Sequence, residues 1–244
     1  MKITEMFLTP SKYVRPRIKL AKVTKIAVHY IGNPNTSAFA NRNYFENCGK
    51  TGARYVSSHY IIGLDGEIIQ CIPLDEWSYC TNQANGYSIS IECCHPNNTG
   101  KFTDATENSL AELCAFLCRK FGLTENDIIR HYDVTGKQCP LYWSPTKYVS
   151  KEVADGRFNA FKAKVSVLLN KSGGLPYKVR ITDNELNVRS GTGTNNPVVC
   201  VLKKGEVYTI VDEKDVNGYK WGLLKSYSSK RNGWISLKYT EKLR

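Results

Sequence analysis

The feature that most restricts the fold of this chain is a Gly- and Pro-containing break at residues 171–176, Lys-Ser-Gly-Gly-Leu-Pro. Such composition is typical of linkers, because Gly permits backbone angles that other residues avoid and Pro cannot continue a helix. The hydrophobic periodicity differs on the two sides of the break. We therefore predict two domains, residues 1–170 and 177–244, joined by a linker over residues 171–176.

Residues before the break alternate between strand-like and helix-like segments. Residues 23–31 (VTKIAVHYI) form a short run rich in Val and Ile, which is typical of a buried strand. Residues 58–63 and 66–72 flank a turn at Leu64-Asp65-Gly66 and are predicted to form a hairpin.

The same alternation continues toward the break. Residues 87–93 alternate as a strand does, and residues 128–133 are predicted to be a short strand or strand end. Residues 103–122 predict an amphipathic helix that begins at Thr103 or Asp104 and ends at Gly122, and residues 157–170 predict another helix. Together these segments predict an α/β domain, a mixed β-sheet flanked by helices.

Residues after the break have a different pattern, in which turn residues separate several short strand-like runs. These runs are YKVRI, LNVRS, VVCVL, EVYTIVDE, YKWGLL and GWISL. The pattern predicts a small all-β barrel.

The charge of the chain restricts its partners. Lys and Arg number 34 against 22 Asp and Glu, a net charge of +12, which favours a polyanionic partner such as nucleic acid or an anionic bacterial envelope. No recognised nucleic-acid-binding motif accompanies the charge, so nucleic acid is not expected as a partner. A basic surface with no specific partner is the remaining alternative.

Two kinds of segment are not found in the sequence. No apolar run approaches the roughly 18 residues of a spanning helix, so we expect no membrane insertion. The N-terminus, MKITEMFLTPSKYVRPR, lacks the apolar core and cleavage site of a signal peptide, and we expect synthesis in a cytoplasm. The nine cysteines show neither a disulfide framework nor a C-x-x-C pair, and we expect most to be reduced and buried.

Two of the four histidines and one cysteine stand where a metal centre is expected. His29 ends the first buried strand, and His131 lies eight residues before Cys139. Two imidazoles and one thiolate leave the fourth position of tetrahedral zinc open, as in catalytic zinc sites. A strand-end histidine is more often a hydrogen-bonded structural residue, so the spacing by itself leaves both interpretations open. Another histidine, His95, is expected in a surface loop.

Four ordered sequence motifs support the catalytic interpretation. They are KIAVHYI at 25–31, SSHYIIGLDGEII at 57–69, YSISIE at 87–92 and RHYDVTGKQCP at 130–140. With these motifs the chain resembles the amidase-2 family of N-acetylmuramoyl-L-alanine amidases over about residues 20–165. That family includes phage endolysins and bacterial autolysins.

The resemblance implies roles for individual residues. It implies zinc (Zn2+) held by His29, His131 and Cys139, with Glu92 as general base or acid and Lys137 polarising the scissile carbonyl group. A solvated carboxylate and an ordinary loop lysine are the alternatives for the last two.

Two further residues have expected positions near this site. His59 is expected close to it, in a packing or substrate-contact role rather than as a fourth ligand. Asp133 is expected either to orient a ligand histidine or to cap a turn.

The C-terminal part resembles bacterial SH3-like domains, through LNVRSGTGTNNPVVCVLKKGEVYTIV, GYKWGLL and NGWISLKYT. Such domains bind cell-wall polymers. Six aromatic residues are candidates for a binding groove, about half of them expected in the barrel core: Tyr208, Tyr219, Trp221, Tyr227, Trp234 and Tyr239.

The resemblance as a whole implies a peptidoglycan hydrolase that cleaves the amide between the lactyl group of N-acetylmuramic acid and L-alanine of the stem peptide. Without a signal peptide, we expect a phage or prophage endolysin of a Gram-positive host, released from the cytoplasm to act on the cell wall. An autolysin exported by an unusual route is the alternative origin. Other functions left open are a non-catalytic peptidoglycan receptor on the same fold, a cysteine peptidase with an SH3-like module, and nucleic-acid binding.

Overall fold

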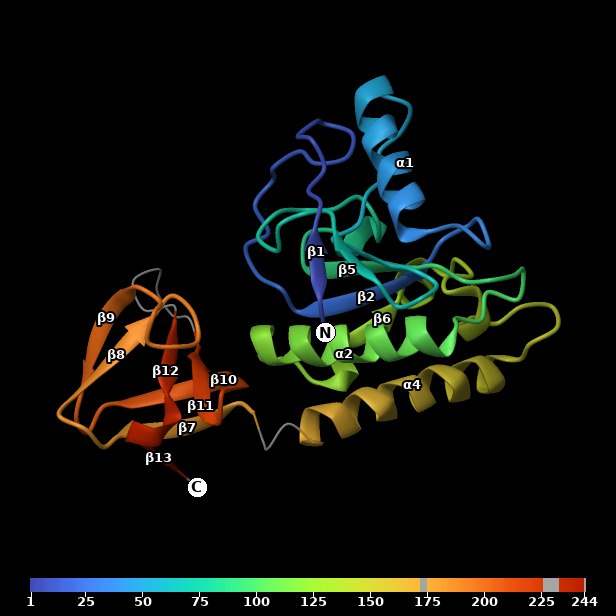
Figure 1. The fold of residues 1–244 in the computed structure, drawn as a ribbon. Helices are drawn as coiled ribbons and strands as arrows, with labels where there is room; N and C mark the ends of the chain where they lie inside the picture. The colour runs from blue at the N-terminus through green and yellow to red at the C-terminus, as the bar shows by residue number, and fades with distance from the viewer. Residues whose placement is uncertain (172–174, 226–232, 244) are drawn as a thin grey trace. The chain divides into compact units, whose positions relative to one another are not determined.

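The computed structural model describes residues 1–171, 175–225 and 233–243 (Figure 1). The chain divides into two compact units, Met1–Leu168 and Leu169–Arg244. In the predicted linker, Lys171 is the last residue of a helix and Leu175 is buried in the core of the second unit, while residues 172–174 lie outside the described residues. Among the described residues, no helix combines the length and the apolar character that a membrane span requires.

The first unit is built on a mixed sheet, which has six strands within the described residues, in the order β1-β4-β3-β5-β2-β6. Its strands are β1 (Ile3–Glu5), β2 (Lys25–Tyr30), β3 (Tyr60–Ile62), β4 (Ile68–Gln70), β5 (Ser88–Cys93) and β6 (Ile128–Arg130).

The middle of this sheet is parallel. β2 pairs in parallel with β5 on one side and with β6 on the other, and β3 is parallel to β5. Ile26, Ala27 and Val28 of β2 are fully buried, as expected for a strand covered on both faces. Because neighbouring parallel strands end at the same edge of a sheet, the residues that end β2, β5 and β6 lie together.

Helices cover both faces of the sheet, with α1 on one side and α2 and α4 on the other (Figure 1). The helices are α1 (Ala38–Thr51), α2 (Asp104–Phe121), α3 (His131–Thr135) and α4 (Lys151–Lys171). Short 3₁₀ turns are η1 (Asn82–Ala84), η2 (Glu125–Asp127) and η3 (Leu141–Trp143), while η4 (Leu237–Tyr239) belongs to the second unit.

The helix expected over residues 103–122 is present as α2. Thr103 caps its first turn by accepting a hydrogen bond from the amide of Thr106 (3.0 Å), and Gly122 ends it in the left-handed conformation. The helix expected at 157–170 begins earlier, at Lys151, because Ser150 supplies an N-cap for the amide of Val153 (3.3 Å).

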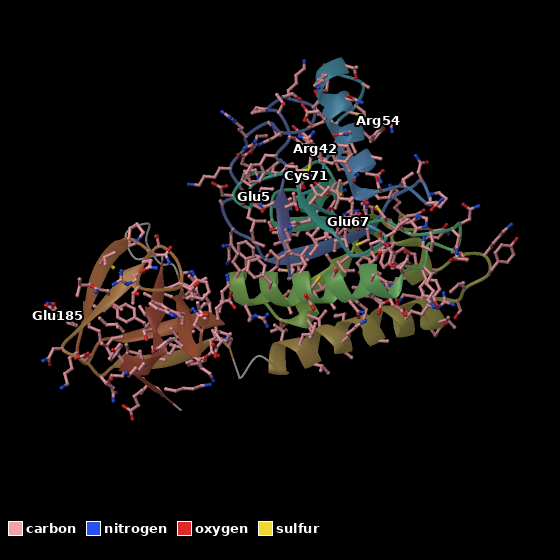
Figure 2. The ribbon with its side chains drawn as sticks, in the orientation of Figure 1. Glu5, Arg42, Arg54, Glu67, Cys71 and Glu185 are labelled. Atoms are coloured by element: carbon pink, nitrogen blue, oxygen red, sulfur yellow. The ribbon has the colours of Figure 1, made fainter. Side chains whose placement is uncertain are left out.

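Helix α1 was not predicted from the sequence. Its residues, AFANRNYFENCGKT, are too polar for a clear apolar stripe, and the buried Phe45 and Cys48 are among the few that pack against the core. Arg42 ties the helix to the N-terminal segment by donating to the backbone oxygens of Met6 (3.0 Å) and Phe7 (2.7 Å) (Figure 2).

The described residues of the second unit form an antiparallel sheet of seven strands, in the order β13-β7-β10-β11-β12-β8-β9. The strands are β7 (Tyr177–Ile181), β8 (Glu185–Arg189), β9 (Val198–Lys203), β10 (Val207–Val216), β11 (Tyr219–Leu224), β12 (Trp234–Ser236) and β13 (Thr240–Lys242). Aliphatic side chains such as Val179, Val188 and Ile235 fill its core. The two units confirm the predicted fold class.

All nine cysteines lie in the described part of the chain, where none of them forms a disulfide bond, and seven of them are buried. Their placement agrees with the expectation that most of them act as small apolar core residues. The other two, Cys80 and Cys200, are partly exposed.

Candidate metal centre

The first two candidate residues come from neighbouring strands. His29 is the penultimate residue of β2, and Glu92 is the penultimate residue of β5. The parallel pairing of the two strands sets His29 directly opposite Glu92. His29 is 1% exposed, so the strand holds its imidazole inside the protein.

The other two come from the segment that follows β6. His131 is the first residue of α3, which Gly136 ends in the left-handed conformation (φ 77°). This turn sends the chain back past Lys137 to Cys139, whose carbonyl oxygen accepts a hydrogen bond from the amide of Tyr132 (2.9 Å). The turn therefore fixes Cys139 beside His131, although the two are separated by a complete loop.

The structure brings His29, His131 and Cys139 together. One nitrogen or sulfur atom from each lies within 4.8 Å of the other two, and all three side chains are buried. Nδ1 of His29 is 3.6 Å from the Cys139 sulfur. Nδ1 of His131 is buried and has no hydrogen-bond partner within the described structure. Buried polar atoms are seldom left without a partner, so this nitrogen is available to a ligand.

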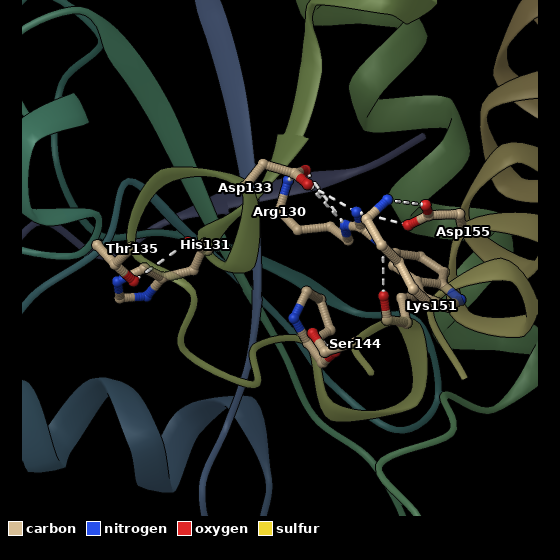
Figure 3. A network of polar contacts seen from close by, with 9 residues as sticks. Arg130, His131, Asp133, Thr135, Ser144, Lys151 and Asp155 are labelled. Atoms are coloured by element: carbon tan, nitrogen blue, oxygen red, sulfur yellow. Dashed lines mark hydrogen bonds and ion pairs between the residues drawn. The ribbon is translucent and has the colours of Figure 1, made fainter. Parts of the chain in front are cut away.

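An ion-pair network holds the base of this segment (Figure 3). The buried guanidinium group of Arg130 lies between the carboxylates of Asp133 (2.6 Å) and Asp155 (2.9 Å), and its Nη1 donates to the carbonyl oxygen of Trp143 (2.6 Å). Asp133 also accepts a hydrogen bond from the amide of Arg130 (2.8 Å). Of the two alternatives for Asp133, the structure supports the cap, and within the described residues Asp133 makes no bond to a histidine.

Burial sets the protonation of the centre. Desolvation lowers the pKa of His29 well below its usual value, and repulsion from Lys137, and from His131 when it is protonated, lowers it further. Desolvation likewise lowers the pKa of His131 to about 4. Both imidazoles are therefore neutral at pH 7, which is the form that binds a metal. Burial raises the pKa of the Cys139 thiol to about 12, so metal binding there would release a proton.

Glu92 has an unusual environment for a carboxylate. Its Oε2 atom is buried and lacks a hydrogen-bond partner among the described residues, while its Oε1 accepts a hydrogen bond from the thiol of Cys80 (3.5 Å). Desolvation raises the pKa of Glu92 to about 7, against the opposing effects of the Cys80 hydrogen bond and the Lys137 charge. A carboxyl group with this pKa can accept and return a proton near neutral pH.

All five candidate residues line one open cavity of about 410 Å³. Lys137 is exposed, and it also lines a second hollow of about 530 Å³, together with Tyr44 of α1 and Arg54.

Two other histidines do not join the centre. His59 is fully buried, and its ring nitrogens bond to Ser90 Oγ (3.1 Å) and to the carbonyl oxygen of Glu76 (2.9 Å), which agrees with a packing role. The expectation of a surface position for His95 is wrong. His95 is 2% exposed, because its ring bonds to the carbonyl oxygens of Ile31 (2.6 Å) and Asn97 (2.7 Å).

The sequence interpretation missed Cys80 and Thr81. Cys80 groups with His29 and Glu92 as a second set of possible metal ligands in the described residues, and the Thr81 hydroxyl lies 2.9 Å from Nε2 of His29. Both residues lie in a loop, which has no strand or helix periodicity, and neither belongs to a recognisable motif.

The candidate aromatic residues of the second unit separate into two groups. Tyr219, Trp221 and Tyr239 line a groove of about 720 Å³, together with Asn217 and Lys238. The other described pair, Tyr208 and Trp234, do not line that groove, and Tyr227 lies outside the described residues.

The mixed sheet and its histidine–cysteine centre define the class of protein, a wall-amidase-like α/β domain followed by an SH3-like domain. Residues 19–141 match the N-acetylmuramoyl-L-alanine amidase family, and residues 184–241 match the bacterial SH3 domain family. The chain belongs to the N-acetylmuramoyl-L-alanine amidase family.

Individual relatives of the chain carry the name of the same family. The chain is 33% identical over 219 residues to the N-acetylmuramoyl-L-alanine amidase CwlL of Bacillus licheniformis, covering 84% of this chain and 55% of that protein. It is 34% identical over 184 residues to the amidase BlyA of Bacillus subtilis (strain 168), covering 67% and 47%. The chain thus spans about half the length of these curated relatives.

Solved structures match the first unit. The structure of PlyL aligns with a TM-score of 0.55 and 26% identity, covering 68% of this chain and 97% of that one. The solution structure of the PlyG catalytic domain aligns with a TM-score of 0.55 and 26% identity, covering 72% and 96%.

Proposed function

We propose that this protein is a zinc-dependent amidase of peptidoglycan. The bond cleaved joins the lactyl group of N-acetylmuramic acid to L-alanine of the stem peptide. The observation that carries the proposal is the meeting of two imidazoles, a thiol, a carboxyl group and a lysine at one cavity. Relatives that are named N-acetylmuramoyl-L-alanine amidases support the same bond.

His29, His131 and Cys139 are the proposed zinc ligands. Two nitrogen donors and one sulfur donor suit zinc better than magnesium or calcium, which prefer oxygen. The unpartnered Nδ1 of His131 and the 3.6 Å approach of His29 Nδ1 to the Cys139 sulfur support binding through both Nδ1 atoms. Bound zinc would supply a Lewis acid that lowers the pKa of water from about 15.7 toward about 7.

Glu92 and Lys137 are the proposed catalytic residues. Glu92 takes a proton from the attacking water and returns it to the departing amine, and its pKa of about 7 suits both transfers. Lys137 stands at the open side of the cavity, where its positive charge stabilises the negative charge that develops on the scissile carbonyl oxygen.

The two parts of the chain have different proposed tasks. Residues 1–170 form the catalytic domain, and residues 177–244, after a linker at 171–176, form a domain that binds the cell wall. The groove beside Tyr219, Trp221 and Tyr239 supports the second assignment, because aromatic faces and polar groups together suit glycan or peptide ligands. We further propose an endolysin of phage or prophage origin.

The test is to incubate the purified protein with Gram-positive cell walls, with and without a zinc chelator, and to identify the products by mass spectrometry. We expect free stem peptides that begin with L-alanine, lost on chelation and restored by added zinc. Cleavage elsewhere in the peptide would indicate a peptidase instead. Firm wall binding without any cleavage would indicate a non-catalytic receptor.

A further inference from the structure

The two ring nitrogens of His29 have different neighbours. Nδ1 lies 3.6 Å from the Cys139 sulfur, on the side of the proposed metal, and Nε2 lies 2.9 Å from the hydroxyl oxygen of Thr81. A neutral imidazole carries a proton on one nitrogen and a lone pair on the other. If Nδ1 is to bind a metal, the proton must be on Nε2 and must be donated to Thr81.

Thr81 is well placed to accept that proton. Its side chain is fully buried, as is that of His29, so no solvent competes for this hydrogen bond. Metal-bound imidazoles generally donate their other N–H to a fixed acceptor, which sets the tautomer and the plane of the ring. In the described structure, Thr81 Oγ1 is the atom at hydrogen-bond distance from Nε2.

Asn85 holds the turn that carries Thr81. Its side-chain oxygen accepts hydrogen bonds from the backbone amides of Thr81 (2.7 Å) and Cys80 (3.1 Å). The same turn continues into η1, where the amide of Ala84 bonds to the carbonyl oxygen of Thr81 (3.0 Å). The position of the Thr81 hydroxyl is therefore determined by a side chain four residues away.

The turn also reaches the carboxyl group opposite His29. The thiol of Cys80, the residue before Thr81, donates to Oε1 of Glu92 (3.5 Å). His29 and Glu92 stand opposite each other on β2 and β5, so one turn contacts the two groups from adjacent positions.

We propose that Thr81 is a positioning residue of the metal centre. It selects the His29 tautomer whose Nδ1 is free for the metal, and Asn85 fixes the turn from which Thr81 does so. This inference rests on the proposed zinc site and adds to it two residues outside the ligand set.

The test compares two substitutions of Thr81 in the 244-residue chain. Thr81→Val keeps the shape of the side chain but removes the acceptor, and Thr81→Ser keeps the hydroxyl group. The zinc dissociation constant of each is measured by competition with a chromogenic chelator, and cobalt(II) substitution reports the ligand geometry through its visible absorption bands. We expect Thr81→Val to bind zinc about 10- to 100-fold more weakly, with altered cobalt bands, and Thr81→Ser to restore both.

A second pair keeps the proposal testable if Thr81→Val does not fold. Asn85→Ala removes the acceptor that holds the turn, and Asn85→Asp retains an oxygen in the same place. We expect weaker zinc binding in Asn85→Ala, by about tenfold, and no weakening in Asn85→Asp.

The outcomes separate this inference from the proposed function. A wild-type protein that binds no zinc would overturn both. Wild-type zinc binding and wall cleavage, combined with a Thr81→Val variant within twofold of the wild-type dissociation constant, would overturn the role of Thr81 alone. A Thr81→Ser variant as weak as Thr81→Val would also overturn it, because the methyl group rather than the hydroxyl would then be responsible.

Discussion

We predict how the free energy of unfolding of the metal-free protein changes with pH when Glu92 is replaced by glutamine. The difference between the variant and the wild type should shift in favour of the variant as the pH rises from about 5 to 8. The folded protein raises the pKa of Glu92 from 4.5 to about 7, chiefly by desolvation. Between these values the folded state holds a proton that the unfolded chain has released. The stability of the wild type therefore falls as the pH rises through this window and becomes level above the folded-state pKa.

The size of the effect follows from the same two values. A pKa change of one unit is worth about 1.4 kcal/mol, so the rise to about 7 corresponds to roughly 3 kcal/mol of lost stability at pH 8. Glutamine cannot ionise, so Glu92→Gln lacks this loss. The glutamine amide is itself a buried polar group, and its burial changes the free energy of unfolding by the same amount at every pH. The prediction concerns the pH dependence of the difference, and titration of His29 and His131 contributes equally to both proteins.

The free energy of unfolding is measured with a metal chelator present, at several pH values between 5 and 8. Native-state hydrogen exchange of peptides from β2 and β5 reports on the first unit without interference from the second. Glu112→Gln removes the same charge from an exposed position on α2, together with a 3.8 Å ion pair to the N-terminal ammonium group, and serves as the control for net charge. If the free energies of unfolding of Glu92→Gln and the wild type differ by the same amount at every pH in this range, burial does not raise the pKa of Glu92.

Three other substitutions or truncations test the remaining parts of the structure. Cys139→Ser should lose zinc binding and wall cleavage together, because a hydroxyl group is a poor zinc ligand; stoichiometric zinc by metal analysis would remove Cys139 from the ligand set. A chain ending at residue 171 should still cleave soluble muropeptides but should sediment less with intact walls, and undiminished sedimentation would contradict a wall-binding second domain. Arg130→Met should lower the free energy of unfolding by about 2 to 3 kcal/mol, because the carbonyl oxygen of Trp143 loses its charged donor and the partly exposed Asp133 and Asp155 lose the cation between them. A change below about 1 kcal/mol in urea denaturation would show that the network is not required.

Local patterns in the sequence were enough for the elements whose signals lie within a few residues. The run of apolar residues at 23–31 predicted the strand that carries His29, and the cap at Thr103 and the glycine at 122 predicted the limits of α2. Helix α1 was missed because few of its residues face the core, so its sequence has no clear apolar stripe. Its caps, Ser37 and Gly52, are nevertheless ordinary cap signals.

The ligand set and the two catalytic residues were expected from four ordered motifs, and their roles remain predictions to be tested with metal. What the motifs could not supply was the environment of each group. The buried, hydrogen-bonded state of His95 and the elevated pKa of Glu92 depend on residues distant in the chain.

The sequence by itself determined the two-domain division proposed here, the strand and helix periodicities and the resemblance that names the ligands, because these are read from near neighbours and ordered motifs. Only the tertiary structure decided that the turn at Cys80 and Thr81 faces both His29 and Glu92. The physical reason is that parallel strands pair segments far apart in the chain. Hydrogen bonds and desolvation act through space, so no local pattern records them.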